Sequence, residues 1–73
     1  MNASELKALL DADPFRPFVV TANRTGRFTV ASPRHALLTA TALYVGRGVD
    51  AVTGIPAEAS MVPLVQVVKV EPA

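Results

Sequence analysis

Two short stretches of alternating apolar and polar residues, joined by a glycine-containing turn, constrain the fold of this chain more than any other feature. Residues 18–23 alternate between Phe, Val and Ala on one face and Val, Thr and Asn on the other. Residues 27–31 alternate in the same way. The segment Asn23–Gly26 between them is typical of a hairpin loop, because Gly26 can adopt a positive φ. The pattern predicts an antiparallel pair of strands with one solvated face.

The first residues predict one short amphipathic helix. Asn2 can cap its N-terminus, and Glu5 stands three residues later, which is the spacing of a capping box. The segment Asp11–Pro14 ends the helix, because the residue before a proline avoids the α conformation. A helix of this length is marginal alone, so its apolar stripe must pack on the sheet. Three leucines form that stripe: Leu6, Leu9 and Leu10.

The middle of the chain admits two interpretations. Residues 36–39 and 42–46 have the composition of two further strands, with Thr39–Thr41 as the turn between them. A continuous helix over residues 34–45 is the alternative, because alanine and leucine favour helices. The two threonines, the β-forming run at 43–45 and the preceding Ser32-Pro33 favour the strands.

The last third of the chain predicts a loop and two more strands. Residues 46–56 begin with Gly-Arg-Gly and have no apolar period, so we expect the longest and most mobile loop there. A strand follows over Ala57–Val62, and Pro63-Leu64 interrupts the chain with about one turn of 3₁₀ helix. The final strand, Val65–Glu71, has an imperfect period that indicates burial on both faces or a bulge near residues 67–68.

These elements predict one small domain over residues 1–73 that is mainly β, of the α+β class. A short N-terminal helix precedes a five-strand, strongly bent antiparallel sheet or a small SH3-like or Sm-like barrel. A chain of this size buries only about 60% of the surface that it exposes when unfolded, so its stability margin is thin. The predicted core contains Phe18, Val20, Phe28, Val30, Leu38, Leu43, Val45, Met61, Leu64 and Val70.

The chemistry-bearing residues are few and scattered. The chain has no cysteine and one histidine, His35, which excludes disulfides, thiolate metal sites and histidine-rich metal sites. No pair of residues has the arrangement of a catalytic nucleophile and its base. We therefore expect no catalytic residues, no cofactor, no metal and no small-molecule substrate. The uncharged runs are far shorter than the roughly 20 residues that span a bilayer, and residues 1–13 lack the basic start of a signal peptide. We expect a cytoplasmic protein with no membrane contact.

The segment Asp13-Pro-Phe-Arg-Pro-Phe18, after a short leucine helix, carries a resemblance. Together with the hairpin at Gly26, the Ser32-Pro33 step and the final strands, it is similar to a family of short bacterial proteins of planctomycete type. That family shows the order helix, PFRPF, strand, DGR, strand, HP, strand. This chain departs from the pattern at residues 24–26 and at Ser32. The resemblance implies a shape and no chemistry.

A second, fold-level similarity is to the Sm-like and SH3-like small barrels. It rests on the order of one helix and five strands, with a break at Pro63-Leu64 before the last strand. The RNA-contacting residues of Sm proteins have no counterpart in this sequence, so this similarity implies fold alone.

The charge distribution suggests where an anion could bind. Residues 14–49 contain five arginines and no acid, whereas each flanking segment carries one base and three acids. If a nucleic acid binds, we expect Arg24, Arg27 and Arg47 to contact its phosphates without reading bases. Arg16 has two interpretations: a guanidinium presented to an anion, or a side chain that holds the corner at Phe15 and Phe18. The structural interpretation is favoured.

The preferred functional prediction is self-association as an interaction module without catalytic activity. The last strand offers valines on both faces and only one charge, so its edge is weakly protected against pairing. A second copy would complete the ladder, and two-fold closure is the commonest outcome. We therefore predict a homo-oligomer whose interface includes Val65, Val67 and Lys69. A weak, sequence-nonspecific nucleic-acid binder is the alternative.

Overall fold

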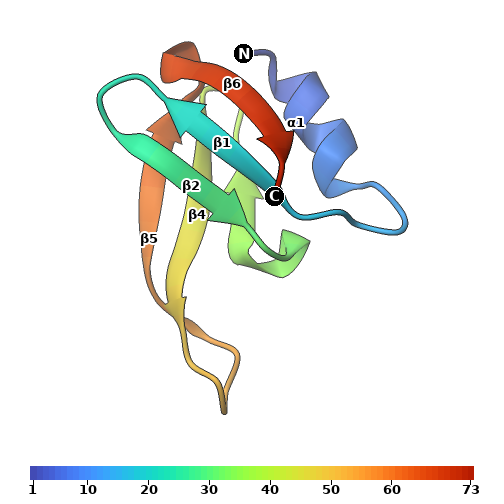
Figure 1. Cartoon of the computed structure of the whole chain (residues 1–73), viewed down its shortest axis with the longest axis vertical. Helices are drawn as coiled ribbons and strands as arrows, with labels where there is room; N and C mark the ends of the chain where they lie inside the picture. Colours follow the sequence, from blue (N-terminus) through green and yellow to red (C-terminus); the bar gives the residue numbers. More distant parts are fainter.

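The computed structural model describes all residues, 1–73, as one α-helix, six strands and two 3₁₀ turns (Figure 1). The helix, α1, spans Ala3–Leu10. At eight residues, α1 is too short to span a bilayer. The remaining elements, in chain order, are β1 Phe18–Ala22, β2 Gly26–Val30, η1 Pro33–His35, β3 Ala36–Leu38, β4 Ala42–Val49, β5 Pro56–Pro63, η2 Leu64–Gln66 and β6 Val67–Pro72.

The strands form two antiparallel sheets of three strands each, in the orders β2-β1-β6 and β3-β4-β5. Figure 1 shows β1, β2 and β6 lying across β4 and β5, with α1 beside β6. The prediction of a mainly β domain with one N-terminal helix is confirmed, but the prediction of a single five-strand sheet is wrong. Pro33 starts the turn η1, which separates β2 from β3, and the two strands join different sheets.

The predicted helix forms with the predicted cap. The side-chain oxygen of Asn2 accepts a hydrogen bond of 2.7 Å from the backbone N–H of Ser4. Of the leucine stripe, Leu6 is fully buried and Leu10 packs against the edge of the core, while Leu9 is 37% exposed. The helix therefore inserts one leucine deeply and leaves another at the surface.

The first hairpin also follows the prediction. Phe18 pairs with Val30 and Ala22 pairs with Gly26, so residues 23–25 make the turn. Gly26 has a φ of 99°, and Arg24 has a φ of 75°, which is uncommon for a residue with a side chain.

The middle of the chain is extended, so the alternative helix over residues 34–45 is wrong. Residues 36–38 pair with residues 43–45 across a turn at Thr39–Thr41. The Thr39 hydroxyl fixes this turn, because its oxygen accepts the N–H of Ala42 at 3.0 Å and the N–H of Thr41 at 3.3 Å. A side chain that bonds its own backbone in this way favours a turn over a helix.

The prediction that a loop begins at Gly46 is wrong, because β4 continues to Val49 and pairs with β5 throughout. Gly46 supports this pairing instead of ending it. A Cβ atom at position 46 would lie 2.8 Å from the ring of Pro56 and 3.2 Å from the carbonyl oxygen of His35. Only glycine permits this approach, so a residue that suggests a loop is a packing requirement of a strand. The connection shortens to residues 50–55.

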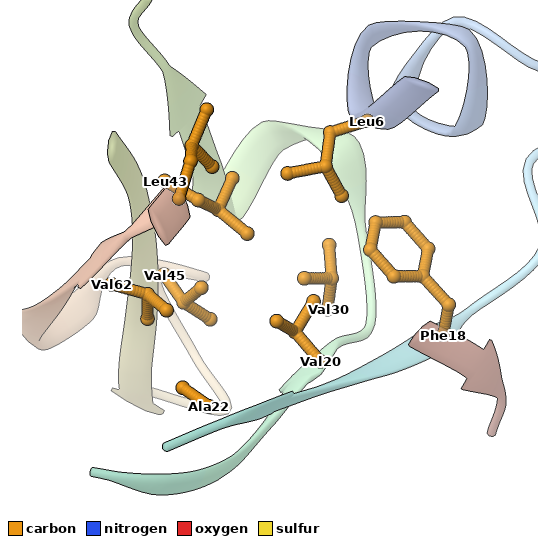
Figure 2. Close-up of a cluster of buried hydrophobic side chains, with 9 residues drawn as sticks. Leu6, Phe18, Val20, Ala22, Val30, Leu43, Val45 and Val62 are labelled. Atoms are coloured by element: carbon orange, nitrogen blue, oxygen red, sulfur yellow. The ribbon is translucent and has the colours of Figure 1, made fainter. Parts of the chain in front are cut away.

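The core lies between the two sheets and below α1, as Figure 2 shows. Six predicted core residues are buried, and three more, Phe28, Leu38 and Val70, are partly buried against them. The prediction for Met61 is wrong, since its side chain is 54% exposed and Val62 is buried instead. Val62 pairs with Leu43 and therefore shares its inward face, whereas Met61 pairs with Tyr44. The buried predicted residues are Phe18, Val20, Val30, Leu43, Val45 and Leu64.

The end of the chain forms a bulged edge strand. Thr21 pairs with Lys69 and Ala22 pairs with Val67, which leaves Val68 as an extra residue in β6. The bulge predicted near residues 67–68 is therefore present. The predicted start of the strand at Val65 is wrong, because residues 64–66 form the turn η2 and β6 begins at Val67.

Candidate functional site

The arginine residues predicted to contact phosphate do not converge. The guanidinium of Arg27 lies 3.6 Å from a carboxylate oxygen of Glu71, and the same carboxylate lies 3.5 Å from the ammonium of Lys69. Arg47 donates a hydrogen bond of 2.7 Å to Glu58 on the neighbouring strand. Both pairs are exposed, so each adds little stability, but each neutralises a charge.

Arg24 is exposed in the β1–β2 turn and forms none of the ion pairs. That turn lies at the upper left of Figure 1, while the end of β4 near Arg47 lies low in the same view. Arg27 and Arg47 thus face two different acidic partners, and Arg47 lies on β4 while Arg24 and Arg27 belong to the β1–β2 hairpin. A phosphate chain would have to displace Glu71 and Glu58 to engage Arg27 and Arg47.

The three residues predicted for self-association also do not share a surface. Val65 lies in η2 and is 92% exposed, whereas Val67 is half-buried and packs against the core. Lys69 pairs with Thr21, on the outer face of β2-β1-β6, and faces Glu71. That face carries the polar and charged side chains of Thr21, Arg27 and Glu71, but it also includes Val19, which is buried although the alternation of β1 predicts it on the solvated side. The valines of β6 therefore do not form one apolar strip.

An uncharged row of side chains crosses the outer face of the other sheet. Leu37, Tyr44 and Met61 are cross-strand neighbours on β3, β4 and β5. Leu37 is 63% exposed and Met61 is 54% exposed. A shallow hollow of about 370 Å³ lies beside this row, and its lining includes His35 and Pro56.

A second apolar surface stands at the tip of the β4–β5 hairpin, defined here by Val49, Val52 and Ile55 and called the hairpin tip. Val52 is 93% exposed and Ile55 is 65% exposed. Figure 1 shows this hairpin projecting away from both sheets, farther than any other loop. Removing exposed aliphatic side chains from water is favourable, so their burial in an interface would stabilise a complex.

Hydrogen bonds fix the backbone of the hairpin tip. The Asp50 carboxylate accepts the N–H groups of Val52 and Thr53 at 2.8 and 2.9 Å. The Asp50 N–H donates to the carbonyl of Ile55 at 3.0 Å, and the Gly54 N–H donates to the carbonyl of Asp50 at 2.8 Å. The predicted mobile loop is therefore a short turn with an internal hydrogen-bond network.

Two further contacts define the electrostatics of the hairpin tip. The N–H of Thr53, and next that of Val52, hold the pKa of the Asp50 carboxyl below its usual value because they bind the ionised form. The imidazole Nε2 of His35 lies 3.2 Å from the carbonyl oxygen of Gly54. The one histidine of the chain thus contacts the turn that carries the exposed aliphatic residues.

A groove of about 470 Å³ lies between α1 and the β6 side of the first sheet, and we call it the α1–β6 groove. Leu9 contributes the exposed leucine of the helix, and Arg16 contributes a guanidinium that forms none of the ion pairs. Arg16 forms no ion pair with the nearby Asp13. The rings of Phe15 and Phe18 pack on each other at 6.0 Å. The groove is lined by Met1, Glu5, Leu9, Arg16, Pro17, Phe18, Val70, Glu71 and Pro72.

Comparisons with protein-family models, with curated proteins and with solved structures found no match. The hairpin tip and the α1–β6 groove were not predicted from the sequence. The sequence shows that Val52 and Ile55 are aliphatic residues near Asp50. It predicts only that they lie in a loop, and it does not predict the conformation of that loop. The groove joins residues from both ends of the chain, so no local pattern indicates it.

Proposed function

We propose that this chain is an interaction module without catalytic activity that associates with a second copy of itself. The observation that supports this most is the hairpin tip. Val52 and Ile55 are largely exposed on a turn whose backbone is fixed by hydrogen bonds to and from Asp50. A preorganised apolar surface loses little conformational entropy when it binds, which is the property of an anchor in a protein interface.

The small core supports a second copy as the partner. Only 11 of the 73 residues are buried, and the chain has no disulfide to compensate. Small domains of this kind commonly gain stability by oligomerisation. Burying aliphatic residues of the hairpin tip against another copy would add apolar contacts that the monomer lacks.

We place the proposed interface at the hairpin tip and not at β6. Val67 is engaged by the core and Lys69 by Glu71, so neither is available as an apolar contact. The row Leu37, Tyr44 and Met61 is a competing surface, but its tyrosine is half-buried and its other two residues are less exposed than Val52. The hairpin tip has the greater exposure and the more defined shape.

As part of this proposal, we infer that the domain is similar in fold to the SH3-like and Sm-like small barrels. The supporting features are the sheet orders β2-β1-β6 and β3-β4-β5, joined by the turn η1, and the 3₁₀ turn η2 before the last strand. The similarity carries no ligand with it.

The test is a sedimentation-velocity concentration series reaching about 1 mM, a range in which contacts of millimolar dissociation constant are detected. The wild type should show an average mass that rises with concentration. Val52→Lys should weaken association about tenfold or more, because a buried valine contributes roughly 1.5 kcal/mol.

Val65→Lys is the matched control, because Val65 is a valine of nearly equal exposure on another surface. It should leave association unchanged. A wild type that stays monomeric over the whole series would refute the proposal. If Val65→Lys abolishes association and Val52→Lys does not, the interface lies at η2 and β6.

A further inference from the structure

We propose that the hairpin tip of one copy binds in the α1–β6 groove of the next copy, so that the chain associates head to tail. The inference rests on the self-association proposed above and names both surfaces of the contact. It accounts together for three features that the fold leaves unexplained: exposed aliphatic residues on a fixed turn, an apolar groove on a different part of the molecule, and an unpaired arginine beside it.

The hairpin tip has the shape of an inserting element. Val52 and Ile55 lie three residues apart on a turn of six residues, and the two strands that carry it pair from Ala42–Pro63 to Val49–Pro56. The paired strands and the internal hydrogen bonds keep the tip projecting, as Figure 1 shows. Two aliphatic side chains at the end of a narrow hairpin need a concave apolar partner to be buried, because a flat surface covers only part of each.

The α1–β6 groove offers such a partner. Its volume of about 470 Å³ lies within the range of about 300–1,000 Å³ typical of apolar binding sites. Phe18 and Val70 form its inner part and border the core, while Leu9 and Pro17 stand at its exposed side. The groove is therefore apolar inside and still accessible from solvent.

One charge on each surface is complementary to the other, Asp50 on the hairpin tip and Arg16 at the groove. Asp50 is the only charged residue between Arg47 and Glu58, so the hairpin tip carries one negative charge beside its aliphatic residues. At the groove, Arg16 is exposed and forms none of the ion pairs, while Glu71 already faces Arg27 and Lys69. Glu5 opposes this attraction in part. Neither Asp50 nor Arg16 forms an ion pair within the chain, so bringing them together would pair the two charges as the aliphatic residues enter the groove.

Two different surfaces on one chain make a heterologous contact, which either closes into a ring or continues as an open chain. The wild type should therefore form species larger than a dimer as its concentration rises. An isologous contact of tip against tip would stop at the dimer. The small size of the two surfaces predicts a weak, rapidly reversible contact.

The experiment removes each surface separately and then mixes the defective chains. Val52→Lys removes the tip and Leu9→Gln removes the groove without adding a charge. Both side chains are at least partly exposed, so circular dichroism should show that each variant stays folded. Each variant alone should associate at least tenfold more weakly than the wild type. An equimolar mixture retains one intact tip and one intact groove, so it should form one-to-one dimers and nothing larger.

A second pair of variants tests the charge contact. Asp50→Asn keeps a side-chain oxygen that can accept the N–H groups of the turn, and Arg16→Gln removes the guanidinium. Each should weaken association several-fold, and the double variant should lose little more than either single one if the two groups meet.

The outcomes separate this inference from the proposed function. If Val52→Lys abolishes association while Leu9→Gln associates as strongly as the wild type, the tip contacts another surface, and the head-to-tail inference is overturned while self-association stands. A wild type that is monomeric at about 1 mM overturns both. Recovery of dimers in the mixture supports both.

Discussion

Replacing Val62 with alanine tests the register of β4 and β5, on which the core and the hairpin tip both depend. Val62 has no exposed surface and lies opposite Leu43, whose side chain is also fully buried. Removing two methyl groups from this position costs about 1.5 kcal/mol in lost transfer from water. The cavity left behind raises the expected loss of unfolding free energy to about 2 kcal/mol. For a domain of this size, that corresponds to a drop in Tm of about 10 °C.

Met61→Ala is the matched control, since it truncates the neighbouring residue on the opposite face. Its side chain is 54% exposed, so the expected change in unfolding free energy is within about 0.5 kcal/mol. Urea denaturation followed by circular dichroism measures both values. A larger loss for Met61→Ala than for Val62→Ala would refute the reasoning, because a slip of one residue in β5 exchanges the two faces.

Three further predictions follow from the same contacts. Gly46→Ala should lower the unfolding free energy by about 1–3 kcal/mol, because the added methyl group meets the ring of Pro56; urea denaturation measures it. The depressed pKa of Asp50 means that its turn contacts stabilise the fold fully above about pH 4 and are lost as the pH falls through the folded-state pKa. NMR titration should show this, and Asp50→Asn should remove it. Gel-shift assays at low salt should detect no complex with single- or double-stranded nucleic acid, because Arg27 and Arg47 already face carboxylates; a salt-sensitive shift would contradict this.

The elements that could be predicted from the sequence are those that local interactions determine. The cap at Asn2, the hairpin at residues 23–26 and the turn at residues 39–41 each depend on side chains within four residues. The alternation of β1 also predicted correctly that Val20 faces the core. In these segments, turn chemistry and the period-two pattern agree, so one conformation is favoured.

The errors concern residues whose role depends on a distant segment. Met61 and Val62 are both suitable core residues, and only the pairing with β4 decides which one faces inward. In the sequence Gly46 suggests a loop, and only its close contact with Pro56 in the fold shows why a strand needs glycine there. The partition into two sheets depends on where β3 pairs. No local pattern carries this information, because tertiary packing overrides the intrinsic preferences of short strands.

The candidate site also combines features that neighbouring residues in the sequence indicate with features that depend on distant segments. The acid in the hairpin tip, Asp50, has a local role that its sequence neighbours indicate, because an aspartate followed by threonine and glycine is typical of a turn. The α1–β6 groove has no such signal, since it joins Leu9 near one end of the chain to Val70 near the other. Arg16 was singled out from the sequence, but its place beside that groove depends on the packing of α1.

The free edge of β6 shows why the last strand is a weaker interface than its sequence indicates. The Ala73 N–H donates to the carbonyl of Pro17. Backbone groups of an antiparallel strand point alternately to its two sides, so those of Lys69 and Glu71 also point toward β1. The backbone groups of the residues between them point away from β1, to the free edge. One outward position is Pro72, which has no N–H to donate. The bulge at Val68 interrupts the ladder at the other end.

Only Val70 is left with a regular outward N–H and carbonyl, and one residue cannot pair a strand from a second copy. A proline and a bulge are among the devices by which natural sheets prevent edge-to-edge pairing. Because β6 is protected in this way, its valines do not create the unpaired edge that a second copy would complete. The proposed self-association then depends on side-chain contacts, and Val52 and Ile55 in the hairpin tip are the largely exposed aliphatic residues that we assign to them.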